Sequence, residues 1–155
     1  MKSPLYSQLL IKASRDAEFS GPPPPDIRPQ YREGAGHNPL CGDKVEWYAE
    51  VDTAHERLGE IRFQACGCMM CKASAGFLAR ALRHKPLEEA RAVYEEVRRI
   101  TDKTETDAPD EADAHPEKPW RALSQIRAYP ARRKCVMMPW NSFFEMLKQE
   151  ADPPK

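Results

Sequence analysis

Residues 44–51, with the sequence KVEWYAEV, decide the fold. Their apolar side chains occupy every second position: Val45, Trp47, Ala49 and Val51. The positions between them are Glu46, Tyr48 and Glu50. A period of two predicts a strand with one buried face. The alternation returns at residues 60–65, where the inward positions are Ile61, Phe63 and Ala65. Because a polar turn at 52–59 separates the two stretches, we predict an antiparallel hairpin.

Helical periodicity follows the hairpin. Beyond residue 71 the spacing changes to three and four, at Ser74, Phe77, Leu78, Ala81 and Leu82. A second such run comes after Pro86, at Leu87, Ala90, Tyr94 and Val97. Pro139 is predicted to open a closing helix, with an apolar face of Trp140, Phe143, Phe144 and Leu147. At the other end, Ser3 and Pro4 predict a short helix up to Ala13, and the proline-rich residues 21–36 predict an extended connector.

Two neighbouring segments carry opposite charge. Residues 101–118 hold seven acidic and two basic side chains and almost no large apolar one, which predicts an acidic loop. Residues 119–135 have no acidic residue and carry five basic ones: Arg121, Arg127, Arg132, Arg133 and Lys134. A basic patch is therefore expected beside the last cysteine.

Length and composition limit the possible classes of protein. The 155 residues, 41% of them hydrophobic, suffice for one core, so we predict a single domain over 1–155 with the insertion at 101–118. Lys and Arg number 24, and so do Asp and Glu, so overall charge offers no attraction to nucleic acid or to an anionic membrane. The apolar run at 9–11 is far shorter than the ~18 residues of a spanning helix. We expect a cytoplasmic protein with no nucleic-acid or membrane partner.

The five cysteines are the most informative side chains. An odd number of thiols in a reducing compartment favours metal ligands or reactive groups over structural disulfides. Cys41 and Asp43 belong to the turn sequence NPLCGD at 38–43, which can point both groups at one divalent metal. Cys68 follows the second strand, and Cys135 follows the basic segment. Three thiolates and one carboxylate are four suitable ligands for Zn²⁺.

Each of these residues also has a purely structural explanation. An intracellular cysteine is often a small buried apolar side chain, and an aspartate in a turn often bonds only to the local backbone. The sequence CGCMMC at 66–71 favours a functional interpretation, because three thiols within six residues are unusual for packing alone.

Three ordered motifs carry a resemblance to a known family: NPLCGD at 38–43, the segment from Gly67 and Cys68 to Ser74, and RRKC at 132–135 before Trp140. The chain resembles the U-type iron–sulfur cluster assembly family, whose members include IscU, SufU and the N-terminal part of NifU. The resemblance implies an α+β fold, in which helices pack on one side of a small antiparallel sheet of about three strands. It also implies that the three motif cysteines meet at one end of the molecule.

Two features indicate the branch of this family. Members similar to IscU have a histidine directly before the third cysteine, where this chain has Lys134. The 66 residues between Cys68 and Cys135 resemble the longer arrangement of SufU. The resemblance implies a zinc-dependent sulfurtransferase whose zinc ligands are Cys41, Asp43, Cys68 and Cys135. It further implies that Cys41 accepts persulfide sulfur from a cysteine desulfurase, with downstream iron–sulfur assembly or acceptor proteins as partners.

Two alternatives stay open. The chain can be a non-enzymatic scaffold for a [2Fe-2S] cluster on Cys41, Cys68 and Cys135, with Asp43 or an extra cysteine as the fourth ligand. It can also be a degenerate, thiol-based regulatory protein. The additional thiols of Cys66 and Cys71 depart from the usual family pattern, as does Ala65 in place of glycine. They can widen the ligand set, form a disulfide with Cys68, or have no function.

Overall fold

The computed structural model describes residues 8–15, 19–102 and 118–148. Its elements, in chain order, are α1 (Gln8–Ser14), η2 (Arg28–Gln30), β1 (Arg32–Asn38), β2 (Asp43–Asp52), β3 (Arg57–Cys66), α2 (Met69–Leu82), α3 (Leu87–Ile100), η4 (Pro119–Ala128), η5 (Pro130–Arg132) and α4 (Arg133–Lys148). The predicted acidic loop falls almost entirely on 103–117, and the predicted helix start at Ser3 and Pro4 falls on 1–7. Both lie outside the described residues.

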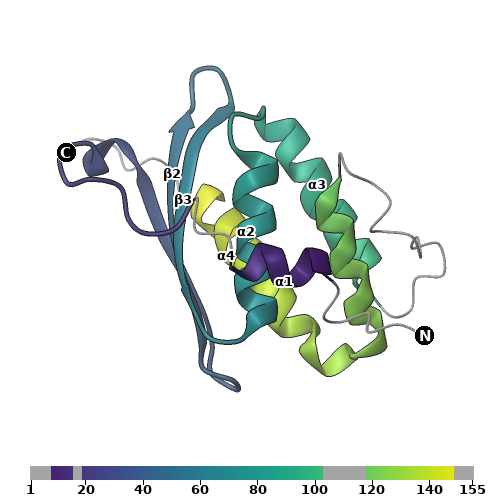
Figure 1. The fold of residues 1–155 in the computed structure, drawn as a ribbon. Helices are drawn as coiled ribbons and strands as arrows, with labels where there is room; N and C mark the ends of the chain where they lie inside the picture. The colour runs from purple at the N-terminus through teal and green to yellow at the C-terminus, as the bar shows by residue number, and fades with distance from the viewer. Residues whose placement is uncertain (1–7, 16–18, 103–117, 149–155) are drawn as a thin grey trace.

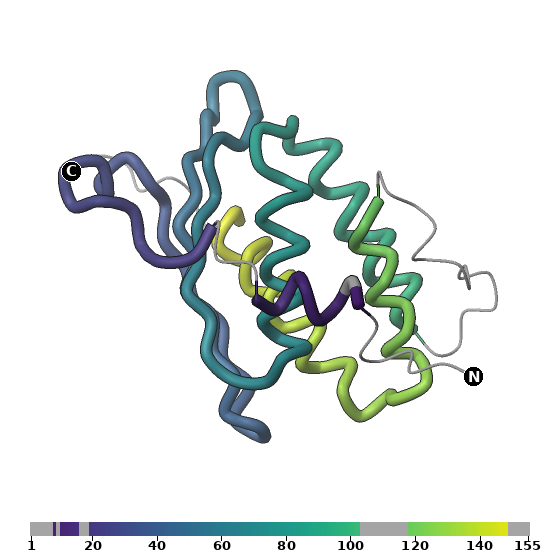
Figure 2. The backbone as a smooth tube through the Cα atoms, viewed as in Figure 1, coloured from purple at the N-terminus to yellow at the C-terminus, as the bar shows by residue number. Residues whose placement is uncertain are grey.

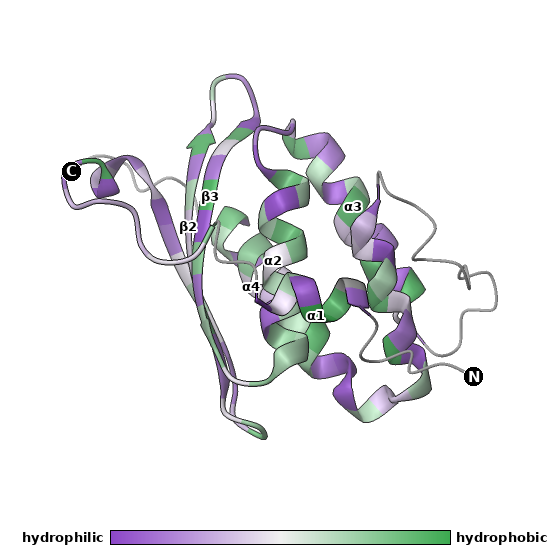
Figure 3. Ribbon diagram, in the orientation of Figure 1, coloured by the Kyte–Doolittle hydropathy of each residue, from purple (hydrophilic) through white to green (hydrophobic). Residues whose placement is uncertain are grey.

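The three strands form one antiparallel sheet with β2 in the centre. Trp47 of β2 lies opposite Gly34 of β1 and Phe63 of β3. The hairpin predicted from residues 44–51 and 60–65 is confirmed, and most of its inward side chains are buried. Hydrophilic and hydrophobic residues alternate along β2 and β3 (Figure 3).

The helices cover one face of this sheet, with α2 and α4 next to the strands and α3 farther away (Figure 1). The core between these layers is centred on Trp47, whose ring meets Phe143 of α4 edge-on at a centroid distance of 5.1 Å. The indole N–H of Trp47 donates to the backbone carbonyl of Pro139 at 3.1 Å. The predicted α+β architecture, a three-stranded antiparallel sheet with helices, is therefore confirmed.

The first strand, β1, replaces the last part of the connector expected at 21–36, so that expectation was wrong there. Its sequence, REGAGHN, has little intrinsic strand preference. Its two glycines face α4, and a Cβ atom at either would clash: Gly34 with Met146 at 2.7 Å and Gly36 with Ser142 at 2.6 Å. The glycines therefore allow the helix to approach the strand closely, which no local pattern announces.

The closing helix begins at Arg133 rather than at Pro139, so the predicted start was wrong. Pro139 lies inside α4, where it cannot donate a hydrogen bond to the carbonyl of Cys135, and such a residue costs a helix roughly 3 kcal/mol. Burial of the helix face offsets this cost, since Val136, Met137 and Trp140 are all in the core. As a result Cys135 lies in the first turn of a helix and not in a loop.

The short helices η4 and η5 lead the chain into α4. η4 packs against α1, α2 and α3, and the chain then passes through η5 into α4 (Figure 2).

The segment before β1 covers part of the other face of the sheet. Arg62 of β3 donates to the carbonyl oxygens of Ser20 and Gly21, and the Arg28 guanidinium lies 5.0 Å from the Tyr48 ring centroid. Tyr48 is therefore buried although it faces away from the helices.

No helix among the described residues is both long and apolar enough to cross a membrane.

Candidate metal centre

Asp43 is the first residue of β2, and its side chain is at the centre of the site. It has no solvent exposure. Its Oδ1 accepts a hydrogen bond from the backbone N–H of Cys68 at 2.9 Å. Gly67, with a φ of +132°, makes this approach possible, because a Cβ atom there would overlap the Asp43 carboxylate. The junction between β3 and α2 is thus shaped around one carboxyl group.

Cys41 is presented by a tight turn between β1 and β2. The carbonyl of Asn38 accepts the backbone N–H groups of Cys41 and Gly42, at 3.3 and 2.8 Å, and the Asn38 side chain accepts the N–H of Leu40 at 3.1 Å. Gly42 adopts a φ of +77°, which favours glycine. The turn directs the Cys41 Sγ to 3.1 Å from Asp43 Oδ2 while leaving the residue exposed to solvent.

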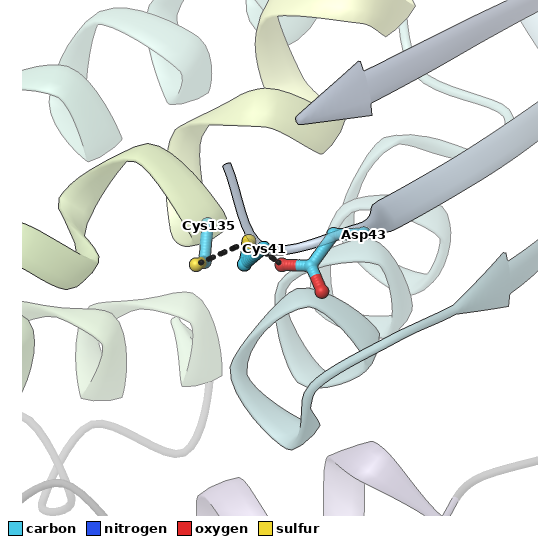
Figure 4. Close-up of side chains that lie close together, drawn as sticks. All are labelled: Cys41, Asp43 and Cys135. Carbon is cyan, nitrogen blue, oxygen red and sulfur yellow. Dashed lines mark hydrogen bonds between the residues drawn. The ribbon is translucent and has the colours of Figure 1, made fainter. Parts of the chain in front are cut away.

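Helices supply the other two predicted ligands. Cys135, buried in the first turn of α4, places its Sγ 3.5 Å from that of Cys41 (Figure 4). Cys68 is the N-cap residue of α2, and its Sγ lies 3.5 Å from Asp43 Oδ2. The structure therefore brings all four sequence-predicted site residues to one end of the sheet, each in contact with Asp43 or Cys41.

The site holds its negative charge on Asp43. Burial raises the pKa of this carboxyl, but hydrogen bonds from the Cys68 N–H and from the thiols of Cys41, Cys135 and Cys68 outweigh burial and hold it below its usual range. Burial raises the pKa of the Cys135 thiol, and its contacts with Cys41 and Asp43 raise it further. The carboxylate thus accepts from protonated thiols, and a divalent cation can take the place of those protons.

The donor set fits a tetrahedral metal ion. One donor atom from each of Cys41, Asp43 and Cys135 lies within 4.8 Å of the others. In a tetrahedron with Zn–S bonds of about 2.3 Å and a Zn–O bond of about 2.0 Å, the ligand atoms are about 3.5–3.8 Å apart. The distances of 3.1 to 3.5 Å at Asp43 and Cys41 are slightly shorter than this. Small side-chain movements therefore suffice for Cys41, Asp43 and Cys135. Cys68 contacts Asp43 but lies outside this group of three, so its thiol must move closer to complete the tetrahedron.

The additional thiols have different positions. Cys66 ends β3 opposite Lys44, is exposed, and lies outside the group of close donor atoms found among the described residues. Cys71 is fully buried in the first turn of α2.

Three further residues matter that sequence reasoning did not assign to the site. Gly67 accommodates Asp43, as described above. Ser74 of α2 donates to the carbonyl of Val136 at 2.6 Å and accepts from the Trp140 indole at 2.9 Å, which fixes α4 beside Cys135. Arg133 donates to Thr101 Oγ1 and to the carbonyl of Arg98 at the end of α3. The sequence signal for all three is that they lie within the cysteine motifs, at 67–74 and 132–135.

Fold and site together define a U-type iron–sulfur assembly protein. Residues 26–136 match the family described as NifU-like N terminal domain, and the chain belongs to this family.

Individual relatives agree with this assignment. The "Iron-sulfur cluster assembly scaffold protein IscU" of Thermotoga maritima is 26% identical over 149 residues, 96% of either chain. The "Zinc-dependent sulfurtransferase SufU" of Bacillus subtilis is 25% identical over 117 residues, 74% of this chain and 73% of that one. The solved structure of FiSufU from Fervidobacterium islandicum shares the fold, with a TM-score of 0.76 at 23% identity, and the match covers 95% of this chain and 100% of that one.

Proposed function

We propose that this chain acts in iron–sulfur cluster assembly as a zinc-dependent acceptor of persulfide sulfur, with Cys41, Asp43, Cys68 and Cys135 as zinc ligands. One observation carries the proposal. The donor atoms of Cys41, Asp43 and Cys135 converge, yet Cys41 alone of these three residues is exposed. The set therefore combines a closed ligand arrangement with one thiol that a partner can reach.

The surroundings of Cys41 support a protein partner rather than a small substrate. Leu40, its neighbour in the turn, is 82% exposed and is one of only two exposed large hydrophobic side chains among the described residues. Arg132 and Lys134 are also exposed and precede Cys135. A cysteine desulfurase that donates persulfide sulfur is the partner that the resemblance implies. Downstream assembly or acceptor proteins would then receive the sulfur.

The sulfur transfer is a thiolate exchange without net oxidation. The Cys41 thiolate attacks the terminal sulfur of the partner's cysteine persulfide. A bond forms between the Cys41 Sγ and that sulfur, the partner's S–S bond breaks, and its electron pair leaves with the partner's cysteine thiolate. When bound, zinc keeps the ligating thiols deprotonated at neutral pH. Asp43 and Cys135 hold the Cys41 side chain in place until the partner arrives.

The second candidate function is a scaffold for a [2Fe-2S] cluster, with iron and sulfide as cargo. The short distance between the Sγ atoms of Cys41 and Cys135 favours an iron–sulfur cluster as much as zinc, because iron and zinc both accept thiolate ligands. The residue directly before Cys135 is Lys134, so this position supplies no histidine ligand for a cluster. The cytoplasmic location, which was predicted from the shortness of the apolar run at 9–11, stays a prediction.

Metal analysis of anaerobically purified protein, followed by a sulfur-transfer assay, tests the proposal. We expect about one zinc per chain. With a cognate cysteine desulfurase and cysteine, mass spectrometry of trapped peptides should place one added sulfur on Cys41. Cys41→Ala should abolish this sulfur and the stimulation of desulfurase turnover, whereas the matched variant Cys66→Ala should retain both. Stoichiometric iron with sulfide would favour the scaffold. A chain that binds no metal and accepts no sulfur would instead be the regulatory protein.

A further inference from the structure

Pro139 divides α4 into two parts, and Cys135 belongs to the first. A proline inside a helix lacks the backbone N–H that would bond the carbonyl four residues earlier, and this is the carbonyl of Cys135 itself. Prolines are also the commonest points at which helices bend. The helix is therefore weakened directly beside a predicted ligand, and the place of the Cys135 thiol depends on what holds residues 133–138 from outside.

Ser74 of α2 bridges the two parts of α4. Its hydroxyl donates to the carbonyl of Val136, the residue after Cys135, at 2.6 Å, and accepts the indole N–H of Trp140 at 2.9 Å. Ser74, Val136 and Trp140 have no solvent exposure, so removing the hydroxyl would leave the Trp140 indole without this acceptor in a dry environment. One buried hydroxyl thus connects the residue after Cys135 with the residue after Pro139.

The bond from Ser74 also connects two helices that carry predicted ligands. Cys68 is the N-cap of α2, six positions before Ser74. The contact between Ser74 and Val136 therefore fixes the start of α4, with Cys135, relative to the helix that presents Cys68. Arg133 anchors the same turn by bonds to Thr101 and to a carbonyl of α3, but α3 carries none of the four predicted ligands.

We propose that Ser74 is a positioning residue of the metal centre. Through the Val136 carbonyl, it holds the Cys135 thiol where a metal ion at Cys41 and Asp43 binds it as a further ligand. The inference rests on the proposed function, since it concerns the same donor set. Groups that orient metal ligands without touching the metal typically change its affinity by about 10–100-fold when they are removed. Ser74 is such a group, and its effect on the metal passes through Cys135.

Cobalt(II) in place of zinc tests this inference on the intact chain, without a partner or an activity assay. The thiolate-to-cobalt absorption in the near ultraviolet, measured per bound cobalt, reports the number of bound thiolates. We expect Ser74→Ala to weaken cobalt and zinc binding by about 10–100-fold. The absorption should fall by about a third, as three thiolates become two. Ser74→Thr keeps the hydroxyl and should recover both values.

Ser142→Ala is the matched control on the other side of Pro139. The Ser142 hydroxyl makes the same two kinds of bond: it donates to the Pro139 carbonyl at 3.1 Å and accepts the indole N–H of Trp47 at 3.1 Å. Because these bonds hold the part of α4 without a ligand, Ser142→Ala should lower the melting temperature but leave the cobalt affinity and absorption unchanged.

A double-mutant cycle separates positioning from a general effect on folding. If Ser74 acts through Cys135, Ser74→Ala should cost no further affinity in the Cys135→Ser variant, where the third thiol is already absent. Circular dichroism checks that each variant is folded. If Ser74→Ala does not fold, Ser74→Thr and Ser74→Val give the same test, since these two side chains differ only by a hydroxyl in place of a methyl group.

Three outcomes would overturn the inference while the zinc site would stand. They are unchanged affinity and absorption in Ser74→Ala, an equal loss of affinity with and without the Cys135 thiol, and an equal loss in Ser142→Ala. Failure of the parent chain to bind either cobalt or zinc would overturn the proposed function and this inference together.

Discussion

β2 begins at Asp43 and ends at Asp52, and these two aspartates have opposite surroundings. Asp43 is fully buried and accepts hydrogen bonds from a backbone N–H and from cysteine thiols. Asp52 is exposed in the hairpin turn, where it accepts the His55 backbone N–H at 3.1 Å and contacts the His55 ring at 2.9 Å. At one end of the strand, α2 and α4 close over the carboxylate, whereas solvent surrounds it at the other.

The comparison shows that an aspartate at the end of a strand does not form a metal site by itself. Hydrogen bonding lowers the pKa of both carboxyls: from His55 at Asp52, and from Cys68 and the thiols at Asp43, where it must also outweigh burial. An aspartate beside a turn becomes a candidate metal ligand when distant parts of the chain bring cysteine thiols close to its carboxylate. Substitutions at the two ends should therefore differ in their effects on stability and on metal binding.

The largest effect is expected for Gly67→Ala at the buried end. The new methyl group would overlap the Asp43 carboxylate and lie 2.9 Å from its Cα atom, at a φ of +132°. We expect the free energy of unfolding to fall by about 2–4 kcal/mol, together with most zinc binding. Urea denaturation and metal content measure both.

Gly42→Ala is the matched control, because Gly42 also has a positive φ, of +77°, but a Cβ atom there meets nothing within 4 Å. Its cost should be only about 1 kcal/mol, from the backbone conformation. Equal losses in the two variants would mean that the contact between Gly67 and Asp43 contributes nothing.

A smaller effect is expected for Asp43→Asn. The amide keeps the size of the side chain and an oxygen that can accept the Cys68 N–H, but it removes the charge that accepts from the thiols. Stability should fall by about 1–3 kcal/mol, and zinc should bind more weakly. Titration with a chromophoric zinc chelator measures the affinity. An unchanged affinity would remove Asp43 from the ligand set.

The smallest effect is expected for Asp52→Asn at the exposed end. The contact of Asp52 with His55 is open to solvent, and exposed ion pairs contribute little to stability. We expect no measurable change in melting temperature or in zinc content, and His55→Ala should behave in the same way. A loss of zinc comparable to that of Asp43→Asn would show that the two ends of β2 are not independent.

The sequence predicted those elements of the fold whose apolar side chains recur at a regular spacing. β2, β3, α2 and α3 were found because their side chains alternate or repeat at helical spacing. β1 was missed, since Gly34 and Gly36 serve the approach of α4 and carry no strand preference of their own. The early start of α4 was missed because Pro139 lies inside the helix, held by burial of its neighbours. Both misses arise from contacts between distant segments.

The same distinction applies to the candidate site. Cys41, Asp43 and Cys135 form one group of close donor atoms, and Cys68 contacts Asp43 beside it. These four residues could be predicted because the sequence motifs contain the donor residues themselves. The supporting residues were less visible: Gly67 acts through a positive φ and a missing side chain, and Ser74 acts through a bond to a carbonyl 62 residues away. Arg133 was predicted only as part of a basic patch, and its hydrogen bond to the carbonyl of Arg98 at the end of α3 could not be read from the sequence.

The distance along the chain between Cys41 and Cys135, 94 positions, also has a consequence for folding order. On a ribosome, Cys41, Asp43 and Cys68 emerge within one hairpin and the start of the next helix, long before Cys135. Contacts between such distant residues form late, because closing a long loop costs entropy before the contact forms. Docking of α4 against the glycines of β1 is therefore the step that completes the ligand set. A nascent chain holds an incomplete, low-affinity site, and tight metal binding marks the finished fold.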